Sequence, residues 1–228
     1  MKVAILYPPF RKGRRRPLLG QNRQFRYSNT EEVRIYPMVP ASSATLLKRD
    51  GSEVLFLDAM NTNIQTDRFY RILFDFNPEL VVLETKTPVI KIHWEFIDDL
   101  KVKKGYKFVL VGDHVTYFPE ESFQYSKVDF VVTGGDYDWA LYKLVHYLSG
   151  KEKDIPKGVY WSEGTSLKNS GSFELLEDLD DLPFIDRELT KWRNYGEAYL
   201  KKPCTYILSG RGCGGNGTVY GQCFFCIW

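Results

Sequence analysis

Five short apolar runs recur along residues 1–150, and each is typical of a β-strand that is buried on both faces. The runs are KVAILY (2–7), EVLFLD (53–58), ELVVLE (79–84), KFVLVG (107–112) and VDFVV (128–132). Helical periodicity fills the intervals: apolar residues recur at i, i+3, i+4 and i+7 from Phe69 to Phe76 and from Leu141 to Leu148. Gly150 stands where the second of these helices is expected to end, and Gly51 and Gly105 mark the expected ends of two further helices, after Lys48-Arg49 and Lys103-Lys104.

Strands that alternate with helices, joined by crossovers too long for hairpins, imply a parallel sheet with helices on both faces. We therefore predict that residues 1–150 form a doubly wound, Rossmann-like α/β domain. For five parallel strands we expect the flavodoxin-type order 2-1-3-4-5.

The pattern changes after residue 150. KGVYWSEGTSL (157–167) predicts a small hairpin that turns at Glu163-Gly164, and the acidic stretch from Glu174 to Asp181 has the polarity of a connector. We expect residues 151–203 to be this hairpin and connector. CTYILSG (204–210) predicts one further strand, which opens the last segment, 204–228.

Composition narrows the class of protein. Of the 228 residues, 43% are hydrophobic and 26% are charged, which is typical of a globular chain. The net charge of +2 gives no global attraction to nucleic acid or to an anionic membrane. No apolar run reaches the length of a membrane span, and Val3–Tyr7 is too short for a signal peptide. All four cysteines lie in residues 204–228, unlike those of a secreted disulfide scaffold, so we expect a cytoplasmic protein.

Ligands of open parallel sheets bind beyond the carboxyl ends of the strands. The loop Tyr7-Pro8-Pro9-Phe10 lacks the glycines of a dinucleotide fingerprint, and the sequence has no Walker A loop, which disfavours NAD, FAD and ATP in their usual sites. Small, hydroxylated or polar residues follow the third, fourth and fifth strands instead, and they leave room for a bulky planar or nucleotide-like ligand. These candidate binding residues are Thr85, Thr87, Gly112, Asp113, His114, Thr133, Gly134 and Gly135. The alternative is that the glycines only form tight turns.

Other polar residues invite simpler interpretations. We interpret Asp58 as a surface or capping residue, His93 as a histidine at the edge of the core, and His146 as a surface residue of a helix. His114 is then the only histidine with a candidate functional role. The loop over residues 8–35 is rich in arginine and could contact phosphate or nucleic acid, although the charge balance favours a solvated loop.

Three cysteines form the pattern Cys213-x9-Cys223-x2-Cys226, in which the Cys-x2-Cys pair holds two thiolates at metal-ligand distance. Glycines on both sides of Cys213 allow the backbone to wrap around a bulky inorganic centre. A structural zinc site with Cys204 as the fourth ligand is an alternative. Six residues of strand at about 3.3 Å each would place Cys204 roughly 20 Å from the other thiols.

The segment TYILSGRGC-(x9)-CFFC resembles the first strand and cluster loop of radical S-adenosylmethionine (SAM) enzymes. The upstream segments resemble the cobalamin-binding branch of that family, in order and over nearly the whole chain. These segments are YPMVPASSATLLKRDGSEVLFLDA (36–59), VGDHVTYFPEE (111–121), VDFVVTGGDYD (128–138), GVYWSEG (158–164) and LDDLPFIDRE (179–188).

This resemblance implies that Cys213, Cys223 and Cys226 hold a [4Fe–4S] cluster whose free iron binds SAM for reductive cleavage. It also implies that the eight loop residues contact a cobalamin, which can supply a methyl group. The Asp-x-His-x-x-Gly motif is absent after the first strand, so any cobalamin would bind without a protein histidine ligand.

Two further departures limit the activity that the resemblance implies. The nine residues between Cys213 and Cys223 exceed the three that are usual in the family, and the barrel that follows the cluster loop in the family is missing. We therefore assign no catalytic residue and expect an inactive chain unless another polypeptide supplies the barrel. The substrate would be a small molecule or a peptide, and we expect no nucleic-acid or membrane partner. Two alternatives remain: a non-catalytic cobalamin or small-ligand module, and a zinc module that contacts RNA through its basic loop.

Overall fold

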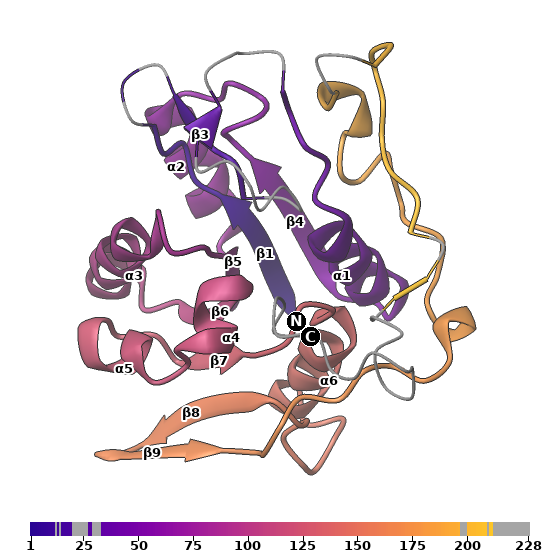
Figure 1. Ribbon diagram of the computed structural model, residues 1–228. Coiled ribbons are helices and arrows are strands. Elements are labelled where there is room, and N and C mark those ends of the chain that lie inside the picture. The colour runs from indigo at the N-terminus through magenta and orange to yellow at the C-terminus, as the bar shows by residue number, and fades with distance from the viewer. Residues whose placement is uncertain are drawn as a thin grey trace, which may run out of the picture.

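The computed structural model describes residues 1–11, 13, 15–19, 27–28, 33–196, 200–208 and 210–211 (Figure 1). Five strands form a parallel sheet in the order β4-β1-β5-β6-β7. Numbered along the chain among themselves, these strands stand in the order 2-1-3-4-5, so the predicted topology is confirmed. Their bounds are β1 (Lys2–Tyr7), β4 (Glu53–Asp58), β5 (Leu80–Glu84), β6 (Lys107–Val111) and β7 (Phe130–Val132).

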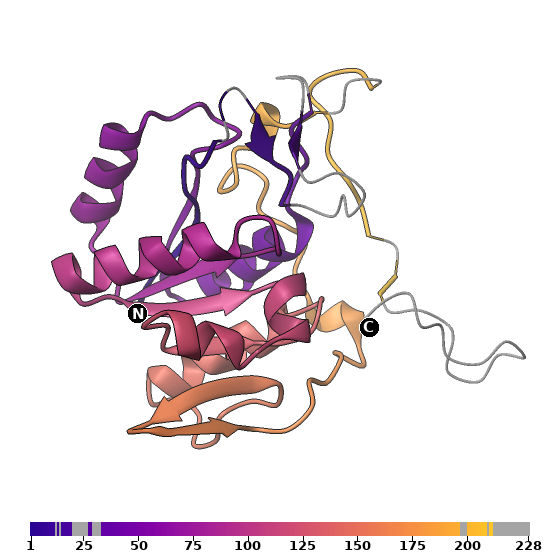
Figure 2. The same cartoon turned by 60° about the vertical axis from the view of Figure 1, so that its left-hand side comes forward.

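The predicted hairpin is also confirmed, and it extends this sheet. Strand β8 (Val159–Glu163) pairs with β7 in antiparallel fashion, with Val131 opposite Tyr160, and β9 (Ser166–Asn169) pairs with β8 at the edge. Figure 2 shows the two strands beside β7. The parallel sheet therefore ends in two antiparallel strands, one of which shields the edge of β7.

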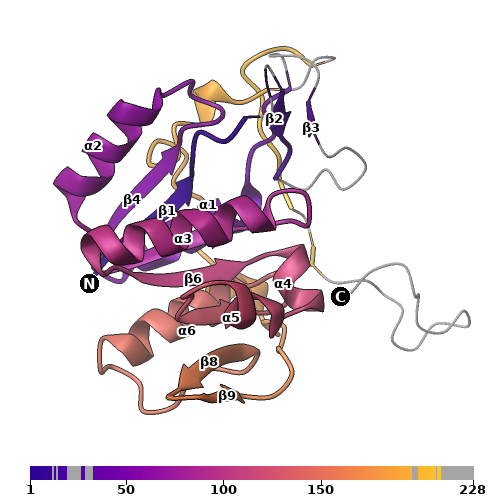
Figure 3. The ribbon, with the colours of Figure 1, turned by 90° about the vertical axis from the view of Figure 1, so that its left-hand side faces the viewer.

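Helices cover both faces of the sheet, as the apolar runs predict (Figure 3). In β1, Val3 and Ile5 face α1 (Met38–Arg49) and α6 (Asp138–Leu148), whereas Ala4 and Leu6 face the opposite layer. That layer consists of α2 (Thr66–Phe76), α3 (Ile90–Lys104), α4 (Asp113–Tyr117) and α5 (Glu121–Tyr125). No helix in these described ranges is long and apolar enough to span a membrane.

The connector packs along α1. Tyr36 and Tyr195 meet edge to face with ring centroids 5.1 Å apart, and Tyr206 packs against the same cluster. Lys48 Nζ donates to Asp186 Oδ2 at 2.6 Å and forms an ion pair with it. The connector also carries two short 3-10 helices, η1 (Leu179–Asp181) and η2 (Trp192–Asn194), and the long first loop contributes a two-stranded sheet of β2 (Arg16–Pro17) and β3 (Tyr27–Ser28).

The strand expected over residues 204–210 is not formed in its described part, 204–208. A strand needs a neighbour for its ladder of hydrogen bonds. Among the described residues, Cys204 N–H donates to Tyr195 O at 3.4 Å and Tyr206 O accepts from the Arg187 side chain, but no ladder follows. The apolar pattern is correct for a strand, and the pairing partner is what this segment lacks in the described part of the chain.

Gly112 ends β6 in a conformation that only glycine tolerates. Its φ is +104°, and a β-carbon would lie 2.6 Å from the carbonyl oxygen of Thr85. Gly105 has φ +67°, but a β-carbon there would have nothing within 4 Å. The two glycines thus share a positive φ and differ in the available space.

We predict that Gly112→Ala lowers the free energy of unfolding by roughly 3 kcal/mol, because strain and a backbone clash add. The matched control Gly105→Ala introduces only the strain and should cost about 1 kcal/mol. Urea denaturation of both variants measures the difference. Equal losses would contradict the proposed clash with Thr85.

Candidate ligand-binding edge of the sheet

The eight candidate binding residues gather at the carboxyl edge of the sheet, because β5, β6 and β7 run parallel. They occupy three neighbouring segments that follow these strands: the loop 85–87, Gly112 with the first two residues of α4 (113–114), and the loop 133–135. The backbone N–H of Thr85 donates to Val111 O at 2.8 Å, and the N–H of Gly134 donates to Thr116 Oγ1 at 3.0 Å. The topology therefore brings together residues that are far apart in sequence.

Most of the hydroxyl groups at this edge are already engaged by the protein. Thr85 is fully buried and its Oγ1 lies 2.8 Å from Nδ1 of His93, while Thr133 donates to Gly158 O at 2.8 Å. By contrast, Thr87 is exposed, and Asp113 and Gly135 are partly exposed. These last three residues present the surface that a ligand lying on the edge would meet.

The ring of His114 is fixed on both sides. Nδ1 lies 3.1 Å from Thr87 Oγ1 and Nε2 lies 2.8 Å from Glu121 Oε2, and the side chain is 5% exposed. Both ring nitrogens therefore have protein partners. A metal could bind this histidine only by breaking one of those contacts.

His93 lies deeper than the edge of the core where the sequence places it. It is completely buried, and burial lowers its pKa to about 3, so the ring is neutral. Its Nε2 makes no hydrogen bond within the described part of the chain. Periodicity identifies its helical face correctly, but the Thr85 hydroxyl that makes deep burial tolerable comes from the residue that follows β5 and not from the helix.

Asp58 and His146 also differ from their surface interpretations. Asp58 is buried: it caps the following turn by accepting from Asn61 N–H at 2.9 Å, and it accepts from the Tyr195 hydroxyl at 2.8 Å. The capping role is thus correct and the surface position is wrong. His146 is largely buried and contacts Asp50 Oδ2 at 2.7 Å.

Sequence reasoning missed the polar cluster at the point where the strand order reverses. The hydroxyl of Tyr7, at the end of β1, donates to the carboxyl of Glu84, at the end of the adjacent β5. Burial raises the pKa of Glu84 to about 7, and the Tyr7 hydrogen bond and the charge of Lys86 partly oppose this rise. The available signal was a carboxyl residue that closes an apolar strand. This reversal is the usual ligand position in open α/β sheets.

A narrow cleft runs from this cluster into the space between the sheet and the α1–α6 layer. It has no room for a water molecule. The buried hydroxyl of Tyr137, which has no hydrogen-bond partner among the described residues, belongs to a side chain that lines it. The lining residues are Ile5, Pro40, Ser43, Val82, Glu84, Val111, Tyr137 and Leu141.

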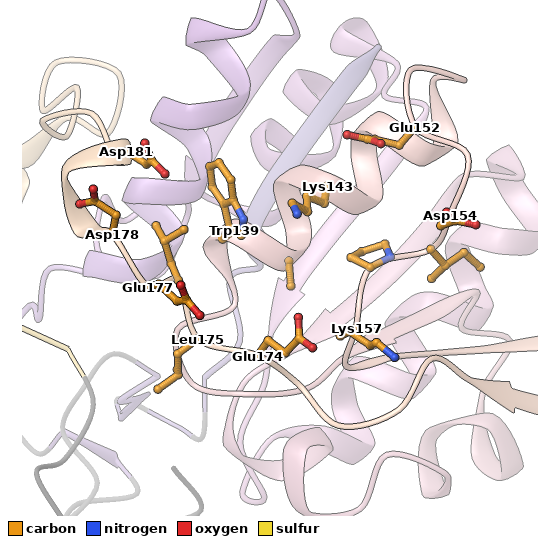
Figure 4. A pocket seen from close by; sticks show the side chains of 14 residues that line it. Trp139, Lys143, Glu152, Asp154, Lys157, Glu174, Leu175, Glu177, Asp178 and Asp181 are labelled. Atoms are coloured by element: carbon orange, nitrogen blue, oxygen red, sulfur yellow. The ribbon is translucent and has the colours of Figure 1, made fainter. Parts of the chain in front are cut away.

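A larger groove of about 850 Å³ lies on the outer side of α6 (Figure 4). The helix contributes Trp139 and Lys143, and the connector contributes acidic side chains that include Glu174 and Asp178. Its acidic groups outnumber its two lysines, but carboxylates alone do not identify a ligand. The groove is therefore secondary to the strand edge as a candidate site.

The predicted metal ligands Cys213, Cys223 and Cys226 lie outside the described residues. Within the described ranges no group of three or more His, Cys, Asp or Glu residues could hold a metal ion. The cluster and the zinc alternative thus stay predictions.

Much of the basic loop also lies outside the described residues. Its described part folds onto the domain: Arg16 is 2% exposed and donates to Met60 O at 3.3 Å, and Arg11 donates to Asn63 Oδ1 at 2.8 Å. The expectation of a solvated loop is therefore wrong for Arg16, whereas Arg11 is exposed as expected.

The raised pKa of Glu84 predicts a pH-dependent penalty. From about pH 4.5 to pH 7 the carboxyl is ionised in the unfolded chain but protonated in the folded one. Stability is therefore lost as the pH rises through this window, by on the order of 3 kcal/mol, and the penalty is constant above it.

Glu84→Gln should remove this penalty. We expect the unfolding free energy of the variant, relative to that of the unsubstituted chain, to increase between pH 4.5 and 7.5 in urea titrations. A difference that does not change with pH would show that Glu84 ionises normally in the folded state.

No protein-family model matches the sequence, and no curated protein matches it. Solved structures do match the fold. The cobalamin-dependent SAM radical enzyme OxsB, with aqua-cobalamin and SAM bound, matches 84% of the chain at a TM-score of 0.60 and 14% identity. The radical SAM methyltransferase TsrM from Kitasatospora setae, with cobalamin and a [4Fe–4S] cluster bound, matches 80% of the chain at 0.51 and 16% identity.

A second TsrM structure, with tryptophan substrate and a SAM analogue bound, matches 75% of the chain at a TM-score of 0.53 and 17% identity. The chain spans only 30% of the length of TsrM and 25% of that of OxsB. Over most of its length, therefore, the chain has the fold of one region of cobalamin-dependent radical SAM enzymes, the family that its sequence motifs resemble.

Proposed function

We propose that the carboxyl edge of the sheet binds cobalamin and that the chain is the cobalamin-binding part of a radical SAM enzyme. The observation that carries this proposal is the fold match to OxsB and TsrM over most of the chain, together with matching motifs in the same order. Bound cobalamin would supply a cobalt centre that carries and transfers an alkyl group. The enzyme class, a methyltransferase-like radical SAM enzyme, is part of the same proposal.

The residues at the edge fit a broad ligand that lies across the strand ends. Thr87, Asp113 and Gly135 offer accessible polar and backbone groups there. Corrin amide groups need such hydrogen-bond partners. The space beside Gly134 is filled by the ring of Phe173, which would lie 3.0 Å from a β-carbon at that position. The closed cleft beneath Tyr137 does not accept a further group in this conformation, so the fit is to the edge and not to the interior.

The geometry favours a cobalamin without a protein histidine ligand. His114 is the only histidine among the eight candidate binding residues, and Thr87 and Glu121 engage both its nitrogens. His93 is buried beneath Thr85. Neither ring presents a nitrogen to a ligand on the edge.

We further propose that Cys213, Cys223 and Cys226 ligate a [4Fe–4S] cluster whose fourth iron binds SAM. The support is the Cys-x2-Cys spacing, the surrounding glycines and the resemblance of TYILSGRGC to the cluster strand of the family. In this division residues 1–150 hold cobalamin, 151–203 connect, and 204–228 begin the radical SAM part. A non-catalytic cobalamin module and a zinc module are the competing outcomes.

Incubation with hydroxocobalamin followed by desalting tests the edge. We expect the chain to retain the visible absorbance of cobalamin. Thr87→Trp, at an exposed position on the edge, should reduce retention at least tenfold, because the indole would occupy the space of the ligand. Thr165→Trp, in the exposed turn between β8 and β9, is the matched control and should bind normally. Failure of the unsubstituted chain to retain cobalamin would refute the proposal.

The same complex tests the axial ligand. His114→Gln should leave the spectrum of bound cobalamin unchanged, because the histidine does not contact cobalt. A spectral shift in this variant, with retention preserved, would identify His114 as a ligand instead.

Anaerobic reconstitution with iron and sulfide tests the cysteines. We expect about four irons and four sulfides per chain by metal and sulfide analysis, and their loss in Cys223→Ser, while Cys204→Ser retains them. A colourless protein with one bound zinc would support the zinc module instead. Cobalamin retention without iron would support the non-catalytic module.

A further inference from the structure

The side chain of Phe173 fills the space beside two glycines of neighbouring strands. A β-carbon at Gly134 would lie 3.0 Å from Cγ of the phenylalanine ring, and one at Gly158 would lie 2.7 Å from its Cβ. Both glycines have positive φ angles, +93° and +79°. A side chain at either position would therefore have to displace Phe173, in addition to straining its own backbone.

The backbone beneath Phe173 is joined by several hydrogen bonds. The N–H of Thr133 donates to Gly158 O at 2.9 Å, and the Thr133 hydroxyl donates to the same oxygen at 2.8 Å. The N–H of Gly158 in turn donates to Gly171 O at 3.2 Å, two residues before Phe173. Phe173 therefore packs on a firm surface formed by the residue that follows β7 and the residue that precedes β8.

Phe173 lies in the part of the connector that is least attached to the domain, residues 171–181, which we call the strap. The strap is exposed except at Phe173 and Leu176, which are partly buried. Between its ends it makes no hydrogen bond or ion pair to the sheet or the helices within the described part of the chain. At its far end, Arg49 of α1 donates to Asp181 O at 3.2 Å. Apolar packing therefore determines where the middle of the strap lies.

The strap also forms one wall of the groove on the outer side of α6 (Figure 4). The residues that it contributes are Glu174, Leu175, Leu176, Glu177, Asp178 and Asp181. Because Glu174 follows Phe173 directly, a shift of the ring away from Gly134 also shifts this wall. Phe173 thus lies between the outer groove and the loop that follows β7.

The loop at Gly134 is held from its other side by α4. The N–H of Gly134 donates to Thr116 Oγ1 at 3.0 Å, and that hydroxyl donates to Gly112 O at 2.9 Å. The strap and α4 therefore enclose the Gly134 backbone, whereas Gly135 stays partly exposed. Without the ring, only the contact with α4 would restrain Gly134 from these two sides.

We propose that Phe173 is a positioning residue: its ring clamps the strap onto Gly134 and Gly158 and couples the loop after β7 to the wall of the outer groove. A ligand that moves the strap in the groove would then alter the loop, and a ligand that moves the loop would alter the groove. The coupling needs no cofactor, and only its relevance to cobalamin binding rests on the proposed function.

Amide hydrogen exchange of the cofactor-free chain, resolved by residue with NMR spectroscopy, tests the clamp. In Phe173→Ala we expect the Gly134 amide to exchange roughly tenfold faster, because its hydrogen bond to Thr116 can then open locally. The acceleration at Gly134 should exceed that at Leu6, a fully buried residue of β1 whose amide reports global unfolding. The indole N–H resonance of Trp139, which lines the groove, should shift in the same variant.

Three further variants separate the ring from general loosening of the strap. Phe173→Tyr keeps the ring at a partly exposed position and should retain slow exchange at Gly134 and the parent Trp139 resonance. Leu175→Ala truncates a strap side chain that is 44% exposed and should leave Gly134 unchanged. Should Phe173→Ala fail to fold, Phe173→Leu replaces it and should show a smaller acceleration in the same direction.

A double-mutant cycle tests the contact itself. Gly134→Ala places a methyl group against the ring and should lower the melting temperature. In a chain that carries Phe173→Ala, the same substitution should lower it by about half as much, because only the backbone strain remains. Gly105→Ala, whose β-carbon has nothing within 4 Å, should have the same effect in both chains.

Unchanged exchange of Gly134 in Phe173→Ala, an equal acceleration in Leu175→Ala, or an unmoved Trp139 resonance would each overturn the proposal. So would equal effects of Gly134→Ala in the two chains. None of these measurements uses a cofactor. A chain that shows the clamp but does not retain cobalamin would refute only the proposed function.

Discussion

The structure depends on the position of β1 between β4 and β5. Parallel pairing on both sides and helices on both faces bury β1 from Val3 to Tyr7, so that Ile5 contributes to one core and Leu6 to the other. Because the chain leaves β1 toward β4 and later returns on its other side at β5, the loops diverge at the carboxyl ends of β1 and β5. That divergence creates the place where Tyr7 meets Glu84, which is the usual position of ligands in open α/β sheets.

The elements and their order could be predicted from the sequence, because a strand that is buried on both faces consists almost entirely of apolar residues and is visible as a short apolar run. The hairpin could be predicted because Glu163-Gly164 interrupts two strand-like segments. The contacts of the buried polar side chains could not be predicted. Asp58, for example, accepts a hydrogen bond from Tyr195, which lies 137 residues further along the chain. The strand expected over 204–210 illustrates the same limit in its described part, 204–208, since an apolar run indicates a strand but pairing with a neighbour forms it.

The candidate site, too, could be predicted from the sequence only in part. Topology alone brings Thr85, Gly112 and Thr133 to one edge, so their location could be inferred from the strand ends. Whether Thr85 and Thr133 are accessible to a ligand could not be inferred, because their hydroxyl groups contact partners in other elements, His93 and Gly158. The pKa of Glu84 depends on burial beside Tyr7 and Tyr137, and no local pattern encodes that environment.

These polar pairs determine how a ligand can approach the edge. For a ligand to enter the interior, the cleft at Tyr137 would have to open and the buried Tyr7–Glu84 hydrogen bond would become exposed. Both changes are unfavourable, because packing contacts and a buried hydrogen bond are lost. A ligand that lies across Thr87 and Gly135 meets accessible groups and displaces only solvent. A broad ligand of the kind proposed for this edge would therefore meet the strand ends from outside the sheet and would not enter its interior.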